Sequence, residues 1–152
     1  MSQDTAIYSY NGSQVLVAFG GLVIKGRPDG AFVRVEPTND EYGDQVGIDG
    51  GITIFGSGDT RSTVTVILSQ SSQFNLVLSN RLAVAKASGQ PLVGGIVIRD
   101  LSGALNGQSI HTGTAWLRRS PTKEYAREPG TREWVFGARL DVDIAGSSVY
   151  LP

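Results

Sequence analysis

The sequence predicts a mainly β fold, an antiparallel β-sandwich or half-barrel flanked by one α-helix at about residues 73–87. Apolar and polar residues alternate along several short stretches, which is the two-residue period of a β-strand. Turn-forming residues separate these stretches, as they do in sandwiches and barrels. Only one stretch has the three- and four-residue spacing of an amphipathic helix. We therefore expect this helix to cover one end or one face of the β-structure.

The composition is typical of a soluble globular domain. The chain has 152 residues, of which 40% are hydrophobic, and its formal net charge is −1 at pH 7. This charge gives no overall attraction to nucleic acid or acidic membranes. No apolar run is long enough to cross a bilayer, and the first ten residues do not resemble a secretory signal. Because the sequence has no cysteine, disulfides and thiolate metal sites are excluded and cytosolic synthesis is the simplest interpretation.

The first third of the chain contains two predicted strands and two polar segments. Residues 1–13 are predicted to be a flexible N-terminal arm. Residues 14–25 form either one bulged strand or two joined strands, because two glycines interrupt them. Residues 32–37 follow a Pro-Asp-Gly turn, and we expect them to pair with 14–25 as a β-hairpin. Residues 38–62 are rich in glycine, with one apolar island at 52–55, and are predicted to be a long loop.

A strand followed by a helix is predicted over 63–89. Val64, Val66 and Leu68 alternate with polar residues, and the period then changes at Ser71-Ser72. Either serine can cap the helix, and Gly89 supplies a left-handed end. The predicted apolar face of the helix consists of Phe74, Val77, Leu78, Leu82 and Ala85.

Three further strands are predicted over 92–100, 109–118 and 133–145, with a polar loop over 120–130. In the last strand one face is apolar and the other largely polar, as in an antiparallel sheet with one wet side. The apolar face is predicted to contain Trp134, Phe136, Ala138, Leu140, Val142 and Ile144, and the other face Val135, Gly137, Arg139, Asp141 and Asp143.

Acidic and basic residues are concentrated in two separate segments. Residues 36–59 contain acidic side chains and no Lys or Arg, whereas 118–132 are mainly basic. The simplest interpretation is that both are solvated loops. The alternative is that one segment contacts the other on a neighbouring copy, since complementary charges fix register and partner choice. The candidate inter-subunit contacts are Asp40, Glu41, Asp44, Asp49, Arg118, Arg119, Lys123 and Arg127.

We predict no catalytic, cofactor or metal site, and therefore no enzymatic activity. The single histidine, His111, has no orienting partner near it in the sequence. Asp141 and Asp143 would lie on one side of the last strand, about 6.5–7 Å apart by strand rise. They could hold a hard cation or act as an acid/base pair, but a polar outer face is the simpler explanation. A small hydrolase built on these three residues is the weakest alternative.

The chain resembles the tail tube proteins of contractile-tailed bacteriophages, which are similar to the inner-tube protein of type VI secretion. The resemblance rests on a Gly-Asp-rich loop and on the strand-to-helix unit over 63–87, with its Ser-Gln-Ser-Ser junction. Asn75, Leu78 and Leu82 follow this junction, and the last strand begins at Trp134. The resemblance extends from about residue 8 to residue 146.

This resemblance implies a single tail-tube-like domain over 1–152 with a structural role in a virion. Hexameric rings would stack into the hollow inner tube of a phage tail, the conduit for genome ejection, surrounded by a contractile sheath. The implied partners are the chain itself, the sheath protein, the tape-measure protein and baseplate or neck proteins. Genomic DNA would pass through the lumen without specific binding, and no membrane is involved. The implied location is the virion tail, after synthesis and assembly in the bacterial host cytoplasm.

Two expectations about surfaces accompany this assignment. Carboxylates lining a DNA conduit would repel the phosphates, so Asp141 and Asp143 are candidate lumen-facing residues. Few Lys or Pro residues protect the predicted strand edges, which suits strands that find partners on sister molecules. The alternative function is a monomeric β-sandwich module that binds carbohydrate or protein. A platform of Tyr42, Tyr125 and Tyr150 would then form its binding surface.

Overall fold

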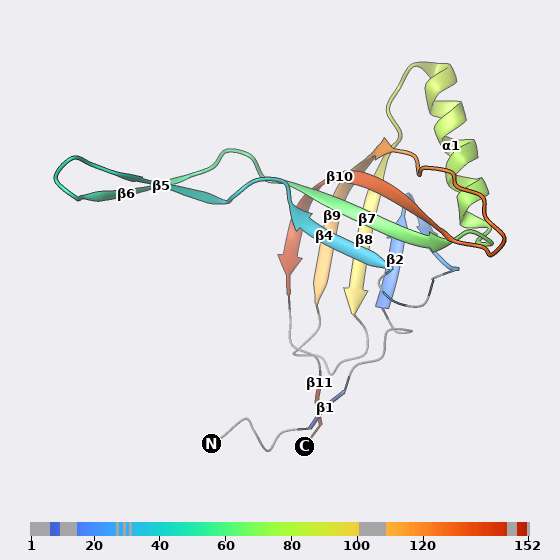
Figure 1. Ribbon diagram of the computed structural model, residues 1–152, viewed down its shortest axis with the longest axis horizontal. Coiled ribbons are helices and arrows are strands. Elements are labelled where there is room, and N and C mark those ends of the chain that lie inside the picture. The colour runs from blue at the N-terminus through green and yellow to red at the C-terminus, as the bar shows by residue number, and fades with distance from the viewer. Residues whose placement is uncertain are drawn as a thin grey trace.

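The computed structural model describes most of the chain (Figure 1). Of the predicted N-terminal arm over 1–13, only Ile7–Ser9 belong to the described residues. The described residues are 7–9, 15–26, 28, 30, 32–100, 109–145 and 149–151. Within them the chain forms eleven strands and one helix. In chain order these are β1 (Ile7–Ser9), β2 (Val15–Phe19), β3 (Leu22–Val23), β4 (Val33–Pro37), β5 (Tyr42–Val46), β6 (Ile52–Gly56), β7 (Arg61–Ser69), α1 (Phe74–Ser88), β8 (Val93–Asp100), β9 (Ile110–Arg119), β10 (Thr131–Ile144) and β11 (Val149–Leu151).

Seven of the strands form one antiparallel sheet in the order β3-β2-β8-β9-β10-β7-β4. Two small antiparallel pairs complete the described strands, β5 with β6 and β1 with β11. In Figure 1 strands β4 and β7 run across β2, β8 and β9, so the large sheet curls over itself. The predicted fold class is confirmed: the chain is mainly β and antiparallel with one helix, and its sheet is a half-barrel.

The hydrophobic core fills the concave side of this half-barrel. Phe19 on β2 and Phe136 on β10 have ring centroids 4.7 Å apart, although two strands separate β2 from β10 in the sheet. Such a contact requires the sheet to curl, and the tilted ring geometry is a favourable one. The buried apolar core consists of Val15, Val17, Phe19, Ile24, Val64, Val66, Leu68, Leu78, Ile96, Ile98, Ala115, Trp134, Phe136 and Ala138.

The predicted pairing of 14–25 with 32–37 is wrong. Gly20 and Gly21 have φ of 60° and 84°, which makes the tight turn that joins β2 to β3 as a hairpin of its own. The other edge of β2 pairs with β8, whereas β4 pairs with β7. Consequently β2 and β4 lie near opposite edges of the sheet. Of the two options left open for 14–25, two joined strands is the correct one.

The 38–62 segment is not a structureless loop. Residues 42–46 and 52–56 pair in register from Tyr42 with Gly56 to Val46 with Ile52, and β7 already begins at Arg61. The predicted apolar island is therefore the strand β6. Its partner β5 shows no hydrophobic periodicity in the sequence. It forms a strand nevertheless, because backbone hydrogen bonds join a strand pair and most side chains permit them.

The predicted helix is confirmed together with its C-terminal end. Gly89 adopts φ of 72°, and its N–H and that of Gln90 donate to the carbonyl groups of Lys86 and Ala85. At the other end Ser72 Oγ accepts a bond from the N–H of Phe74 at 3.3 Å. The predicted apolar face is buried or half-buried, with Leu78 only 2% exposed. The helix flanks the end of the sheet opposite β5 and β6 (Figure 1).

Candidate assembly surfaces

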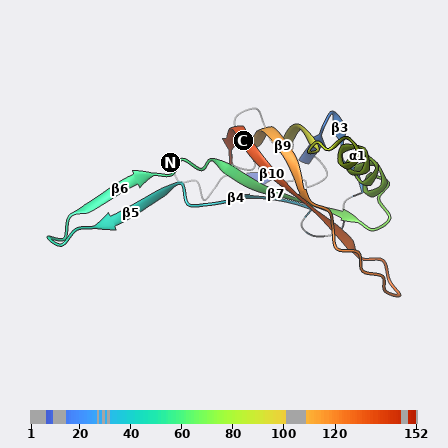
Figure 2. The same cartoon turned by 90° about the horizontal axis from the view of Figure 1, so that it is seen from above.

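The hairpin β5–β6 projects from the body of the molecule, and we refer to residues 38–60 as the arm. Figures 1 and 2 show it extending away from the sheet in two perpendicular views. The substantial contacts of β5 and β6 are with each other. A two-stranded hairpin alone is at best marginally stable in water. The arm thus depends on its own ladder and on its attachment to the body.

The arm exposes large apolar side chains on strands whose outer edges pair with no other strand in the described part of the chain. Each of these side chains is more than half exposed, and Ile48 at the tip is fully exposed. The set comprises Tyr42, Val46, Ile48, Ile52, Ile54 and Phe55. Exposed apolar strands with unpaired edges are surfaces that recruit another chain. This arm therefore has the character of a protein-binding element.

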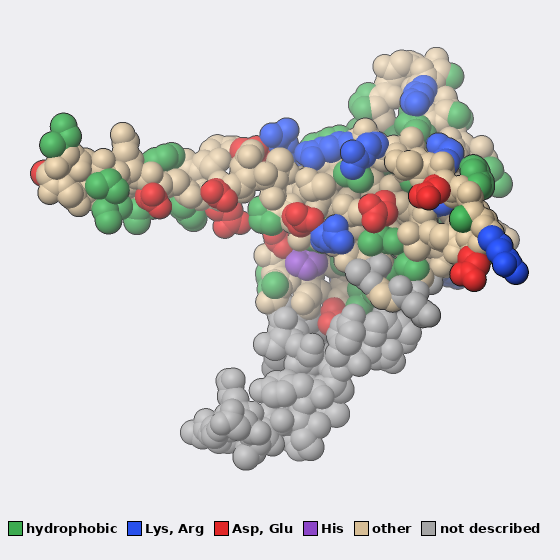
Figure 3. Space-filling model, viewed as in Figure 1, with side chains coloured by type: hydrophobic (Ala, Val, Ile, Leu, Met, Phe, Trp, Pro, Cys, Tyr) green, Lys and Arg blue, Asp and Glu red, His purple; other side chains and the backbone are tan. Residues whose placement is uncertain are grey.

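The arm is also acidic. The four acidic candidates for inter-subunit contact, Asp40, Glu41, Asp44 and Asp49, are all exposed on it. No Lys or Arg occurs between residues 38 and 60. Figure 3 shows hydrophobic and acidic side chains intermixed along the arm, with basic ones only at its base. A partner for this surface must therefore combine apolar contact with positive charge.

An ion pair fixes the base of the arm where it joins β7. Asp59 accepts hydrogen bonds from Arg61 Nε and Nη2, both at 2.8 Å, and from the Arg61 backbone N–H at 3.1 Å. The Asn39 amide also bonds the same carboxylate. These bonds hold the pKa of Asp59 well below its usual range, and the bonds from the Arg61 side chain make the largest contribution. The two ends of the arm are thereby tied together.

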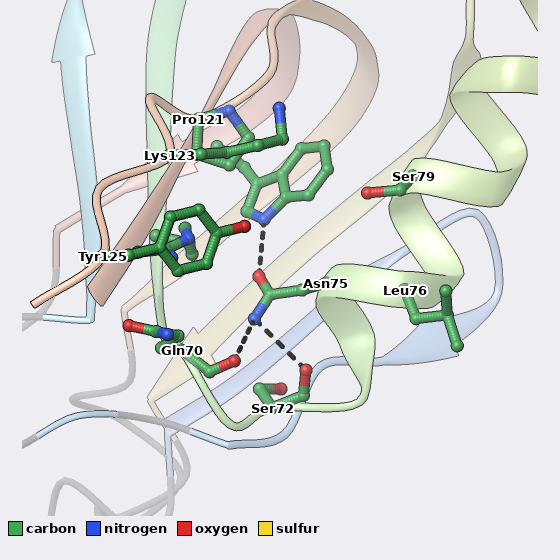
Figure 4. Close-up of a pocket in the computed structure, with 10 residues that line it drawn as sticks. Gln70, Ser72, Asn75, Leu76, Ser79, Pro121, Lys123 and Tyr125 are labelled. Carbon is green, nitrogen blue, oxygen red and sulfur yellow. Dashed lines mark hydrogen bonds between the residues drawn. The ribbon is translucent and has the colours of Figure 1, made fainter. Parts of the chain in front are cut away.

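A pocket lies at the opposite end of the molecule, between α1 and the loop over 120–130 (Figure 4). Its floor is held by Trp134 Nε1, which donates to Asn75 Oδ1 at 3.0 Å. Asn75 Nδ2 in turn donates to the carbonyl groups of Ser69 and Ser72 at 3.0 and 3.2 Å. One side chain therefore links the start of the helix, the turn before it and the last large strand. The cavity has a volume of about 380 Å³.

Of the basic candidates, Lys123 and Arg127 lie around this end, whereas Arg118 bonds Thr63, whose hydroxyl oxygen is 3.3 Å from that of Thr38 at the start of the arm. Lys123 lines the pocket, and Arg127 is exposed on the same loop. Arg118 is exposed on β9 and donates to Thr63 Oγ1 at 3.0 Å, and Arg119 is exposed at the end of that strand. No ion pair within 4.0 Å joins residues 36–59 to residues 118–132, both of which are fully described. The predicted contact between the two segments in different copies stays a prediction.

A bulge in β10 changes the predicted arrangement of the two aspartates. Leu140 pairs with Gly113 but Val142 pairs with Thr112, so Asp141 is an extra residue in the strand. Asp143 consequently lies opposite His111, on the side of the sheet that Leu140 occupies. The prediction that Asp143 belongs to the polar face is wrong, because the inserted residue shifts the alternation. Val142 and Ile144 are exposed beyond this point, contrary to the predicted apolar face.

The bulge also gives His111 a partner that the sequence did not indicate. His111 Nδ1 and Asp143 Oδ1 are 2.5 Å apart, and the histidine side chain is only 16% exposed. The two residues are 32 positions apart, so no local pattern could reveal the pair. A search for a carboxylate in register with the single histidine across the two strands would have found it. Which aspartate faces a lumen stays a prediction.

Strand β4 forms one edge of the large sheet. No strand among the described residues pairs with the outer edge of β4, whose other edge pairs with β7. An edge of this kind offers backbone donors and acceptors to another chain. Pro37 at the end of β4 lacks a donor, so the free ladder is short.

The tyrosine platform of the alternative function does not form. Tyr42 is on the arm, and Tyr125 is on the loop at the opposite end of the molecule. The side chain of Tyr150 lies outside the described residues. Among the described residues there is no helix long and apolar enough to cross a membrane. The described residues also contain no group of three or more His, Asp or Glu side chains placed to hold a metal ion.

The fold is shared with chains from two contractile injection systems. A chain in the cryo-EM structure of the anti-feeding prophage cap, described as a tube-terminating cap, aligns with a TM-score of 0.53 and 11% sequence identity, covering 87% of this chain and 88% of that one. A chain of the extended PVC sheath/tube terminator of an extracellular contractile injection system aligns with a TM-score of 0.52 and 13% identity, covering 87% and 94%. No protein-family model and no curated protein sequence matches this chain. At these identities the likeness establishes the fold alone.

Proposed function

We propose that this chain is a structural subunit of a phage-like contractile tail. Hexameric rings of the subunit stack into the hollow inner tube, which conducts the genome and is surrounded by a contractile sheath. The observation that carries the proposal is the arm, an acidic and apolar hairpin whose strands β5 and β6 make their substantial contacts with each other and leave their large apolar side chains exposed. The fold shared with chains of tube-terminating assemblies supports the same role.

The free edge of β4 supports self-association as well. Ring closure is one of the ways in which β-proteins remove their exposed edges, because each subunit completes the sheet of the next. In this arrangement the strands of neighbouring subunits join into a barrel that lines the lumen. Asp141 or Asp143 would contribute negative charge there, which keeps the passing DNA from binding.

The partners in this proposal are the tail sheath protein, the tape-measure protein and baseplate or neck proteins, and the location is the virion tail. The particle is assembled in the host cytoplasm without a membrane. We propose no catalytic step, since the His111–Asp143 pair joins β9 to β10 and serves to hold the two strands together. A monomeric binding module is disfavoured by the separation of Tyr42 from Tyr125.

A second candidate function is that of a subunit that ends the tube. The structures with the shared fold are described as a tube-terminating cap and a sheath/tube terminator. Negative-stain electron microscopy of the purified protein separates the two functions. A repeating tube subunit forms tubes of many rings, whereas a terminator forms single rings that do not stack.

Charge reversal of the basic segment tests whether assembly uses it. The double variant Arg118→Glu, Arg119→Glu is expected to stop tube growth, because it opposes the acidic arm of the neighbouring copy. Circular dichroism should show an unchanged β-sheet content, which excludes unfolding after the loss of the Arg118–Thr63 bond as the cause. Tubes of normal length from this variant would refute the contact.

A further inference from the structure

We infer that the tip of the arm of one copy binds in the pocket between α1 and the loop over 120–130 of a second copy. The arm tip is defined as residues 46–52, and the pocket is the cavity above Trp134 and Asn75. This inference rests on the proposed function, because it names the contact that joins one subunit to the next. It assigns to both features a role that neither has within a single subunit.

The positions of the two features in the molecule favour a contact between copies. The arm forms one end of the long axis, and α1 with the 120–130 loop forms the other end (Figure 1). A contact between opposite ends is heterologous, so the same contact can be repeated by every further copy. Such contacts close into a ring or continue as a filament, which are the two forms that a tube requires.

The arm tip is built to present one apolar side chain beside one carboxylate. The Gly47 N–H donates to Gly51 O at 2.7 Å, and the Gly50 N–H donates to Gly47 O at 3.0 Å. Asp49 Oδ1 accepts from the Gly51 N–H at 3.1 Å. These bonds order the turn while Ile48 remains fully exposed. The ordered tip loses little conformational freedom when it binds.

The pocket has the complementary chemistry. Tyr125 and Leu76 supply exposed apolar surface on its two sides. Lys123 and Arg132 are its charged residues, and no carboxylate lines it. The Arg132 guanidinium is already engaged, since it donates to Glu124 O and lies 5.4 Å from the centroid of the Tyr125 ring. Lys123 is therefore the cation available to Asp49, while the apolar sides take Ile48.

The walls of the pocket are held in place before any partner arrives. Gly130 N–H donates to Gln70 Oε1 at 3.0 Å, and Gln70 N–H donates to Gly130 O at 2.9 Å. These bonds attach the end of the loop to the turn before the helix. The bond between Trp134 and Asn75 attaches the helix to β10. A site that is formed in advance binds more tightly, because it needs no reorganisation.

A second cavity on α1 fits the arm tip less well. It has a volume of about 400 Å³ and is lined by Val84, Leu92 and Pro91 together with Arg81. It contains no lysine, and the Arg81 guanidinium is engaged because its Nη1 donates to Gly20 O at 3.4 Å. Charge complementarity with the acidic tip thus favours the pocket that contains Lys123.

Cysteine cross-linking of the full chain tests the contact directly, because the natural sequence has no cysteine. The variant Ile48→Cys is mixed with a tagged Ser79→Cys variant, which places a thiol on the helical wall of the pocket. A disulfide forms only when the Cα atoms come within about 4.4–6.8 Å. The control mixture replaces Ser79→Cys with Val93→Cys, an exposed position on β8 outside the pocket.

The inference predicts a disulfide-linked heterodimer from the Ser79→Cys mixture at a yield several-fold above that of the Val93→Cys mixture. Equal yields, or no heterodimer from either mixture, would overturn it. Electron microscopy of the protein without cysteine substitutions distinguishes failure of this contact from failure of the proposed structural function. Rings or tubes without the Ser79 cross-link would refute this contact and leave the structural function intact, whereas the absence of any assembly would refute both.

Charge reversal adds a matched pair of variants. Lys123→Glu is expected to reduce the yield of the Ile48–Ser79 cross-link several-fold, because it places a carboxylate opposite Asp49. Lys86→Glu makes the same charge change at an exposed position of α1 that does not line the pocket. This control should leave the yield unchanged. Equal reductions by the two variants would show that only the overall charge of this end of the molecule matters, and this result would overturn the role of Lys123.

Discussion

The body and the arm of this molecule are both made of antiparallel strands, yet they differ in what holds them. In the body, large side chains such as Trp134, Phe136 and Leu68 are almost completely buried against one another. In the arm, residues of comparable size such as Ile54 and Phe55 are more than half exposed. The body is thus stabilised by its own core, and the arm leaves its apolar surface for another molecule.

This difference separates folding from assembly. Apolar burial contributes about 25 cal/mol per Å² of surface removed from water, so the core of the body accounts for the stability of the subunit. The same term acts on the arm only after a partner covers it. Substitutions in the body should therefore change the unfolding of the monomer, and substitutions in the arm should change association.

The largest effect is expected from Phe136→Ala. Phe136 is fully buried and contacts Phe19 across the half-barrel. Its truncation should lower the free energy of unfolding by about 3–5 kcal/mol, through lost burial and the cavity that remains. Urea unfolding of the monomer measures this loss. A loss below about 1 kcal/mol would mean that the two halves of the sheet do not pack as described.

Asn75→Ala should have the next largest effect. It removes the acceptor of the Trp134 indole N–H and the donor to Ser69 and Ser72. Leaving the buried indole N–H without a partner costs about 1–3 kcal/mol of unfolding free energy. Asn75→Asp retains an acceptor for the indole but turns a carboxylate oxygen toward the Ser69 and Ser72 carbonyl groups, so it should also destabilise the fold. A loss below about 0.5 kcal/mol from Asn75→Ala would show that the indole bond is not the reason for this asparagine.

Gly113→Ala tests the close approach of β9 to β10 at the bulge. A Cβ atom at this position would meet the carbonyl oxygen of Arg139 and lie 2.7 Å from Leu140 Cα. We expect a loss of about 1–3 kcal/mol in thermal or urea unfolding, because the strands must move apart. Gly130→Ala is the matched control, since nothing lies within 4 Å of its added Cβ. Equal stability of the two variants would exclude this steric requirement.

Ile54→Ser tests whether the exposed surface of the arm contributes to association and not to the stability of the monomer. Ile54 is 72% exposed, so the monomer should lose less than about 0.5 kcal/mol in unfolding free energy. Self-association, measured by sedimentation velocity, should nevertheless weaken clearly, because this surface is covered only in the assembly. A variant that assembles like the natural chain would show that β6 is not part of the contact.

The smallest effect is expected at the base of the arm, when the pH is lowered. The bonds from Arg61 lower the pKa of Asp59 in the folded state. Their stabilising contribution is therefore fully present above the unfolded pKa of about 3.9 and is lost as the pH falls through the lower folded value. The carboxyl carbon of Asp59, followed by NMR, should stay in its ionised position below pH of about 3.9. Titration in the ordinary range would show that the pair is not formed.

Local features of the fold could be predicted from the sequence, and features set by distant residues could not. The helix was predicted with its apolar face and with Gly89 at its end, because capping and helical spacing act within a few residues. The partner of β4 was predicted wrongly, because Gly20 and Gly21 close a hairpin before the chain reaches β4. Strand pairing depends on which edges remain free, and this is a property of the whole sheet.

The candidate site shows the same division. The segregation of acidic and basic residues is visible in the sequence. The structure places the acidic candidates on the arm and Lys123 at the opposite end of the body, with Arg118 nearer the base of the arm. The pairing of His111 with Asp143 was missed, since the bulge at Asp141 leaves the alternation of residue types unbroken while it shifts the register. The pocket was missed because its lining comes from three separate segments, the turn and helix over 70–79, the loop over 120–130 and β10.

Electron microscopy of the purified chain over a series of protein concentrations tests the central claim most directly. The account predicts rings or tubes in which the arm of each copy lies against the body of a neighbour and the edge of β4 is covered. Monomers at every concentration and salt level would contradict it. An assembly in which each sheet is complete within one chain, with the arm in solvent, would contradict it equally.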